Sequence, residues 1–282
     1  MSSHSPSPSS SQPSDLWLAL MVGNSRLHWG WFAQSTLLTA WDTPHLTDAA
    51  ITTLMQQRFT PSPSWGADLG WHLPAVKPAS PPLLWLASVV PKQTQRWVTY
   101  PPSHILTLDQ MPLRGLYPTL GIDRALALWG AVQQVGSPVL VIDGGTALTL
   151  TAADENQRLM GGAILPGLRL QLRSLSQDTA GLPAVTFAVT APLPDRWATD
   201  TPTAIQSGVI YTLLAGLRDF VNDWWERYPN GAVILTGGDG PLLAQQLRRH
   251  YRQQSHLLHE SPHLVLLGIS AARAATNLRA IS

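Results

Sequence analysis

The sequence predicts an α/β protein of two domains in which one structural unit is duplicated. The chain has 282 residues, of which 44% are hydrophobic, and a typical domain contains about 100 to 200 residues. Apolar stretches of strand length alternate with stretches of helical periodicity. A glycine-containing turn between two apolar strands occurs twice at domain-sized spacing, at residues 21–25 and 143–147. We therefore expect a soluble protein with two related domains.

The composition limits the possible functions. The chain has no cysteine, which excludes disulfides, thiolate nucleophiles and thiolate metal sites. Its formal net charge is +1 and its Lys and Arg residues are scattered, so we expect no nucleic-acid partner and no membrane partner. The N-terminus lacks the basic start and the apolar stretch of a secretory signal, and no apolar run reaches about 18 residues. These features predict a cytoplasmic protein.

The patterns of the N-terminal half predict its elements in order. Residues 1–14 are mostly Ser and Pro, and such a segment buries too little apolar surface to order itself, so we expect a disordered tail. Residues 16–32 predict two strands joined by a polar turn. Residues 60–82 are rich in Pro, Ser and Gly, which favours an irregular insertion. A strand at 83–90 follows, and then a short helix and a strand within 94–108.

The C-terminal half predicts a similar series. Residues 122–135 place apolar side chains at helical spacing, and residues 138–168 predict three strands joined by two turns. We expect two further helices, at residues 202–225 and 242–254. A buried strand that ends in a glycine-rich turn is expected between them, at 232–240, and a final strand followed by a helix at 263–278.

The two related glycine turns suggest a phosphate site. At an offset of 122 residues, Met21 aligns with Asp143, Gly23 with Gly145, and the flanking strands with each other. Glycine turns present backbone N–H groups to phosphate oxygens without side-chain obstruction. A third such turn, Gly237–Gly238, is expected at the same strand ends. We infer that a nucleotide lies between the two domains.

At this point the chain resembles the type III pantothenate kinases, over about residues 16–268. Eight motifs occur in the order typical of that family: Gly23-Asn24-Ser25, Ser88-Val89-Val90-Pro91, Leu120-Gly121-Ile122-Asp123-Arg124, Asp143-Gly144-Gly145-Thr146-Ala147, Gly161 to Gly167, Leu182-Pro183, Thr201 with Ala204-Ile205 and Gly208, and Thr236-Gly237-Gly238.

The resemblance implies a fold and an activity. It implies two duplicated ribonuclease H-like domains of the actin-like and sugar-kinase superfamily, at residues 15–118 and 119–282, with an interdomain nucleotide cleft. The implied reaction is phosphorylation of pantothenate by ATP, the first step of coenzyme A biosynthesis. Mg²⁺, a monovalent cation (K⁺ or NH₄⁺) and a homodimer that completes the pantothenate pocket are implied as well.

Asp123 and Arg124 are the main candidates for the substrate site. From the residues alone, Asp123 reads as a cap or first-turn carboxylate of a helix, and Arg124 as a surface cation. The resemblance implies instead that Asp123 is the general base and that Arg124 binds pantothenate, because a planar guanidinium suits a carboxylate. The same motif implies substrate contacts from Gly121 and Ile122.

Asp143 is the candidate metal ligand. It could form an Asx turn, but the adjacent glycines and the Thr146 hydroxyl favour a site for Mg²⁺ and phosphates. The resemblance implies that the ATP-binding residues are Gly23, Asn24, Ser25, Arg26, Gly144, Gly145, Thr146, Thr236, Gly237 and Gly238.

Met21 departs from the family pattern, which has an aspartate at this position. A methionine does not hold Mg²⁺ through charge. We expect an active enzyme with altered metal dependence, and expect Met21→Asp to raise activity or lower the Mg²⁺ requirement. The alternatives are a non-catalytic nucleotide-binding or regulatory member, and a kinase for another small hydroxylated substrate.

Tyr117 and Thr201 are further candidates for contacting pantothenate. Tyr117 lies only six residues before Asp123 in a shortened segment, so an ordinary loop tyrosine is an equal alternative. Thr201 matches a threonine that closes over pantothenate from the partner subunit, although a helix N-cap is equally natural there.

Overall fold

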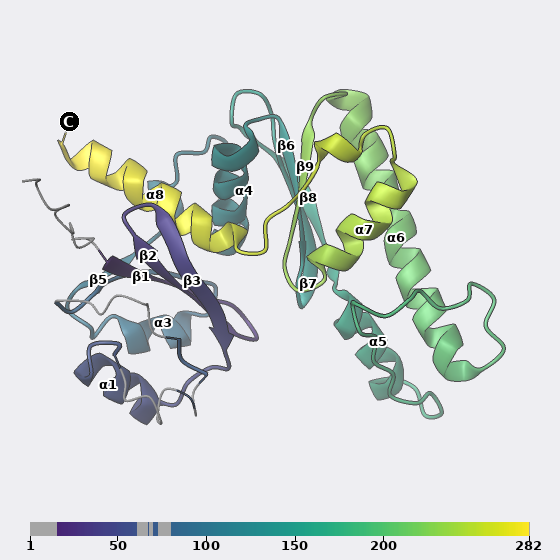
Figure 1. Ribbon diagram of the computed structural model, residues 1–282, viewed down its shortest axis with the longest axis horizontal. Helices are drawn as coiled ribbons and strands as arrows, with labels where there is room; N and C mark the ends of the chain where they lie inside the picture. Colours follow the sequence, from purple (N-terminus) through teal and green to yellow (C-terminus); the bar gives the residue numbers. More distant parts are fainter. Residues whose placement is uncertain (1–15, 61–66, 68–69, 73–79, 282) are drawn as a thin grey trace, which may run out of the picture.

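The chain folds into two mixed β-sheets with helices on their faces (Figure 1). The computed structural model describes residues 16–60, 67, 70–72 and 80–281. The predicted tail and most of the predicted 60–82 insertion lie outside the described residues. The N-terminal sheet has the order β3-β2-β1-β4-β5. Its strands are β1 (Leu16–Val22), β2 (Leu27–Ala33), β3 (Thr36–Thr43), β4 (Leu83–Ser88) and β5 (Ser103–Ile105).

The C-terminal sheet repeats this order, as β8-β7-β6-β9-β10. Its strands are β6 (Val139–Gly144), β7 (Ala147–Ala153), β8 (Leu159–Pro166), β9 (Ala232–Thr236) and β10 (Leu258–Glu260). In both sheets the first three strands are antiparallel, and the fourth and fifth run parallel to the first. Two sheets with the same strand order and directions confirm the predicted duplication.

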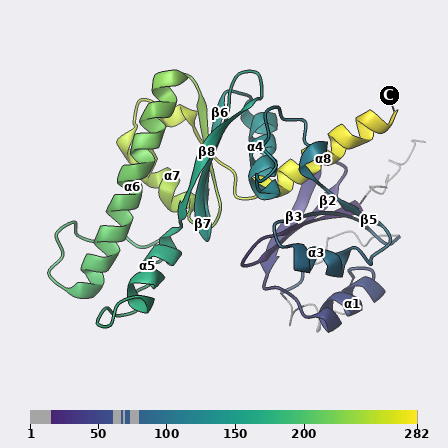
Figure 2. The ribbon, with the colours of Figure 1, turned by 180° about the vertical axis from the view of Figure 1, so that it is seen from behind.

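The helices form an outer layer on each sheet and a layer between the sheets, as the two opposite views show (Figures 1 and 2). The outer face of the N-terminal sheet packs against α1 (Asp48–Gln56) and α3 (Pro91–Trp97). The outer face of the C-terminal sheet packs against α6 (Thr201–Arg227) and α7 (Gly240–His250), with α5 (Leu168–Gln177) beside α6. Between the sheets lie α4 (Ile122–Val135) and α8 (Leu264–Ile281).

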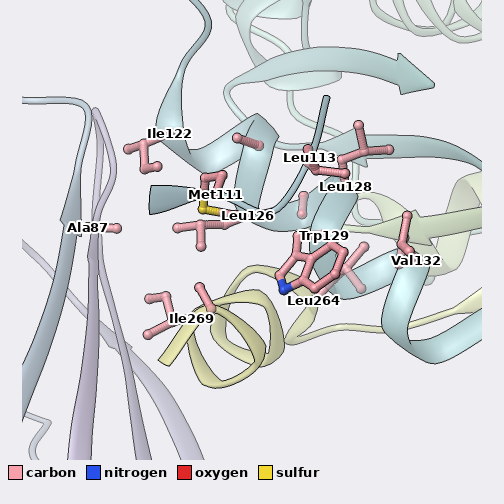
Figure 3. Close-up of a cluster of buried hydrophobic side chains, with 14 of the residues drawn as sticks. Ala87, Met111, Leu113, Ile122, Leu126, Leu128, Trp129, Val132, Leu264 and Ile269 are labelled. Atoms are coloured by element: carbon pink, nitrogen blue, oxygen red, sulfur yellow. The ribbon is translucent and has the colours of Figure 1, made fainter. Parts of the chain in front are cut away.

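One apolar cluster joins the two sheets through α4 and α8 (Figure 3). Side chains alternate between the faces of a strand, so Trp17, Ala19 and Met21 of β1 enter this cluster while Leu18 and Leu20 face outward. In β6, Val139 and Val141 enter it in the same way. Positions 21 and 143 therefore both face the region between the sheets.

Several predicted elements need correction. The predicted strand at the start of residues 263–278 is wrong, because this segment is helical from Leu264 onward as part of α8, and the last strand is β10. The predicted helix at 242–254 ends at His250. The elements β3, α1 and α5 were not predicted. No helix among the described residues is long and apolar enough to cross a membrane.

Candidate functional site

The two glycine turns meet between the sheets. Ser25 Oγ lies 2.9 Å from Thr146 Oγ1, a hydrogen bond between residues 121 positions apart. Each turn is closed in a similar way: Gly23 N–H donates to Arg26 O at 3.0 Å, and Gly145 N–H donates to Ala147 O at 3.1 Å. The predicted pairing of the two hairpins is therefore present in the fold.

The third glycine turn supports the second. Thr236 pairs with Asp143 in the parallel register between β9 and β6, and Gly237 follows with a φ of +80°, which favours glycine. A Cβ on Gly237 would overlap Asp143 Oδ1. Asp239 N–H donates to Gly144 O at 2.9 Å. Only a residue without a side chain fits at position 237, because the turn passes directly against the Asp143 carboxylate.

Asp143 is a carboxylate in an unfavourable environment. It is the second-to-last residue of β6, is partly buried, and accepts no hydrogen bond from any residue that the structure describes. Burial, and then the negative charge of Asp123, raise the pKa of Asp143 to about 6, although His28 opposes this shift. The Asx-turn alternative is wrong, since such a turn requires a hydrogen bond to the carboxylate. A carboxylate so poorly compensated is suited to a bound cation.

Asp123 and Arg124 lie in the first turn of α4, whose N-cap is Gly121. Asp123 Oδ1 accepts from Arg124 N–H at 2.8 Å. A Cβ on Gly121 would overlap the same Oδ1, so the glycine leaves room for the carboxylate. Because Asp123 raises the pKa of Asp143 through its charge, the two carboxylates lie within electrostatic reach of each other.

The Arg124 side chain is buried and rigidly held. Its Nε donates to Thr151 Oγ1 at 3.0 Å, its NH2 group to Leu150 O at 3.1 Å, and its NH1 group to Tyr117 Oη at 3.0 Å. The side chain is 8% exposed, and no carboxylate among the described residues forms an ion pair with it. Arg124 is thus a buried cation rather than a surface one, held in place but without a counter-charge.

Thr201 stands apart from these residues within one chain. It begins α6, which packs on the face of the C-terminal sheet opposite to α4. The N-cap interpretation of Thr201 is wrong, because Asp200 caps the helix by accepting from Thr203 N–H at 2.9 Å. Thr201 lines an open surface hollow of about 500 Å³, together with Leu182 and Ile205 among others.

The sequence alone did not indicate three side chains near the first hairpin. His28 Nδ1 lies 2.7 Å from Asp42 Oδ1, and His45 Nε2 lies 3.0 Å from Gly23 O. These contacts depend on strand pairing and on the loop after β3. In the sequence, only the position of His28 indicates that a side chain lies near the hairpin, because His28 follows Ser25 by three residues on the next strand.

The duplicated sheets and their opposed glycine turns define the actin-like ATPase and sugar-kinase fold class. Solved structures agree. A Campylobacter jejuni protein assigned to the Baf family of transcriptional activators superposes with a TM-score of 0.59, 18% identity, and coverage of 93% of this chain and 99% of its own. A Sinorhizobium meliloti protein assigned as a 2-dehydro-3-deoxygalactonokinase has a TM-score of 0.51, 14% identity, and coverage of 92% and 96%. At these identities the likeness shows the fold alone.

Sequence comparison is more specific. The profile of the family described as type III pantothenate kinase matches residues 17–223. The type III pantothenate kinase of Nostoc sp. (strain PCC 7120) is 48% identical over 255 residues, which are 90% of this chain and 92% of the relative. That of Synechococcus sp. (strain JA-3-3Ab) is 43% identical, with coverage of 93% and 94%. The chain therefore belongs to the type III pantothenate kinase family, as the eight motifs indicated.

Proposed function

We propose that this chain transfers the terminal phosphoryl group of ATP to the primary hydroxyl of pantothenate between its two sheets. Family membership supports the reaction. The contact between Ser25 and Thr146 supports the location of the phosphate site at the two glycine turns. Two glycine turns brought together in this way offer backbone N–H groups and hydroxyls to one chain of phosphates from both sides. The third turn, at Gly237 and Gly238, would lie beside the rest of the nucleotide.

Arg124 would bind the carboxylate of pantothenate. A buried guanidinium without an ionic partner is costly unless a ligand supplies the missing negative charge. The three groups that hold Arg124 fix its plane, so its remaining N–H groups have a defined direction toward a carboxylate. Tyr117 would contribute by positioning Arg124 and by contacting the substrate with its own hydroxyl, which is consistent with its 40% exposure.

Asp123 would orient the hydroxyl that attacks and accept its proton. Phosphoryl transfer passes through a loose transition state, so the base is needed mainly to position the nucleophile and takes the proton late. Asp123 lies next to Arg124 in the chain, and this adjacency ties the base to the group that would hold the other end of pantothenate. The substrate would thus be fixed at both its carboxylate and its reacting hydroxyl.

Asp143 fits a cation that accompanies the phosphates. Its carboxylate accepts no hydrogen bond among the described residues and has a raised pKa, and an oxygen ligand of this kind is one that Mg²⁺ or K⁺ accepts. Mg²⁺ would neutralise charge on the phosphates. Met21 offers no second carboxylate. Asp143 would therefore be the protein ligand of Mg²⁺, and the phosphates of ATP would supply the other ligands. We infer that a monovalent cation, K⁺ or NH₄⁺, is also required.

A homodimer in the cytoplasm would complete the pantothenate pocket. Thr201 begins α6, on the face of the C-terminal sheet opposite to the helix that carries Asp123, and it lines an open hollow that would close over the site of a second copy. Trp197, near this hollow in the chain, is 88% exposed, and a large apolar side chain so exposed is typical of an interface.

A substrate panel tests the proposed function. ADP release would be measured with ATP, Mg²⁺ and K⁺, with pantothenate, with a set of sugars, and with no acceptor. We expect ADP release that depends on pantothenate, with a phosphorylated product of matching amount. Turnover of a sugar but not of pantothenate, or of neither at millimolar ATP, would contradict the proposal.

A further inference from the structure

A row of side chains crosses the N-terminal sheet beside the first hairpin. In the antiparallel registers, Met21 of β1 pairs with His28 of β2, and His28 pairs with Asp42 of β3. Directly paired residues project from the same face of a sheet. Asp42, His28 and Met21 therefore share the face that looks toward the C-terminal domain.

Asp42 fixes the orientation of the His28 ring. His28 Nδ1 lies 2.7 Å from Asp42 Oδ1. Burial alone would raise the pKa of Asp42, but the hydrogen bond and charge of His28, together with the charges of Arg26 and His263, hold it below its ordinary value. An ionised carboxylate only accepts hydrogen bonds, so Nδ1 carries the proton that is shared with Asp42. The other ring nitrogen, Nε2, is left for another partner.

Nε2 lies against the phosphate hairpin. It is 3.4 Å from the point that a Cβ on Gly23 would occupy, and the His28 side chain is 43% exposed. Asp42 is the carboxylate in contact with the ring, the charges of Arg26 and His263 also act on Asp42, and the charge of His28 lowers the pKa of Asp143. Arg26, next to the turn, is cationic, and Met21 adds no negative charge where the family pattern has an aspartate.

An anionic oxygen is a better partner for Nε2 than a metal ion. Within the described ranges, no three His, Cys, Asp or Glu side chains converge to hold a metal. A carboxylate on one side of an imidazole and a phosphate on the other both stabilise its protonated form, in which both nitrogens donate. A charge-assisted hydrogen bond of this kind is stronger than a neutral one.

We propose that His28, oriented by Asp42, is a substrate-contacting residue that donates a hydrogen bond from Nε2 to the terminal phosphate oxygens of ATP, on the side of the site where Met21 replaces a carboxylate. This inference rests on the proposed function for the identity of the nucleotide. His28 then holds the phosphate directly through charge, and the first hairpin needs no carboxylate-bound metal. Asp42 is a positioning residue that acts through His28.

ATP binding in the absence of metal tests this inference. Calorimetry with the full chain in EDTA would compare wild type, His28→Gln, His28→Lys and, as a control, His256→Gln. This control alters an exposed histidine whose ring lies 3.1 Å from the Gln253 carbonyl. Loss of a charged hydrogen bond predicts about ten- to hundredfold weaker ATP binding in His28→Gln. His28→Lys should recover part of the affinity, and His256→Gln should match wild type.

Kinetics separate this contact from a structural role and from the proposed function. In His28→Gln the KM for ATP should rise by a similar factor while the KM for pantothenate stays within about twofold. Unchanged ATP affinity in EDTA would overturn the inference, and so would an effect that appears only as a higher Mg²⁺ requirement. If His28→Gln does not fold, Asp42→Asn, at a side chain 44% exposed, must weaken ATP binding at least severalfold. Absence of pantothenate turnover in wild type, with intact ATP binding, would count against the proposed function instead.

Discussion

Asp143→Asn should stabilise the ligand-free protein in a pH-dependent way. The pKa of Asp143 is raised from 3.8 to about 6 in the folded chain. A carboxyl group with a raised folded pKa favours folding in its neutral form, so its contribution is fully present below pH 3.8 and is lost as the pH rises through about 6. At about 1.4 kcal/mol per pKa unit, the ionised side chain costs about 3 kcal/mol by pH 7.

The magnitude follows from the surroundings of this carboxylate. It lies near the end of a buried strand, no hydrogen bond from the described residues compensates it, and Asp123 adds like charge. An amide of the same shape removes the charge and keeps the packing against Gly237. The variant should therefore gain up to about 3 kcal/mol at neutral pH and little near pH 4.

Urea unfolding without nucleotide, in EDTA, checks this expectation. The difference in unfolding free energy between Asp143→Asn and wild type should grow between pH 4 and 7, whereas Asp109→Asn, at an exposed aspartate, should show no such growth. Mg²⁺ or K⁺ added at pH 7 should stabilise wild type and not Asp143→Asn. Equal stability of the two proteins at all pH values would refute the reasoning.

Substitutions at four further positions, with matched controls, test separate parts of the site. Arg124→Ala should raise the KM for pantothenate about ten- to hundredfold in steady-state assays, and Arg124→Lys should recover little, because an ammonium lacks the planar set of donors. Gly237→Ala should cost about 1 to 3 kcal/mol in urea unfolding, whereas Gly208→Ala, within α6 and with open space around the added methyl, should be neutral or stabilising by up to about 1 kcal/mol; equal effects would contradict the close approach to Asp143. Met21→Asp should lower the Mg²⁺ concentration for half-maximal rate while lowering thermal stability, because position 21 is buried; no change in the Mg²⁺ titration would contradict this. Thr201→Val should raise the KM for pantothenate and leave that for ATP unchanged, and an unchanged KM would remove Thr201 from the pocket.

The parts of the fold that the sequence predicted are those with a local signal. The apolar runs around Gly23 and Gly145 predicted four strands and their turns, and their similarity predicted the duplication. Strand β3 was missed because apolar residues occur on both of its faces, which hides the alternation. The sequence predicts a strand at the start of α8 because a buried helix and a buried strand share a continuous apolar run.

The candidate site divides in the same way. Glycine turns and the Asp123-Arg124 pair are contiguous motifs, so they were visible in the sequence. Two of the three hydrogen-bond partners of Arg124, the Thr151 hydroxyl and the Leu150 carbonyl, lie on β7, more than 20 residues further along the chain. The pairing of His28 with Asp42 depends on a strand that was not predicted. Residues that act through strand register leave no local pattern, and for that reason their roles required the structure.

The most direct test of the account is the turnover of Asp123→Asn. ADP release that depends on pantothenate would be measured at saturating ATP, Mg²⁺ and K⁺, and ATP affinity would be measured by calorimetry on the same preparation. Because the amide cannot accept the hydroxyl proton, kcat should fall about a hundredfold or more, while ATP affinity stays within about twofold of wild type. A variant that keeps kcat within about threefold of wild type would contradict the proposal that Asp123 is the base.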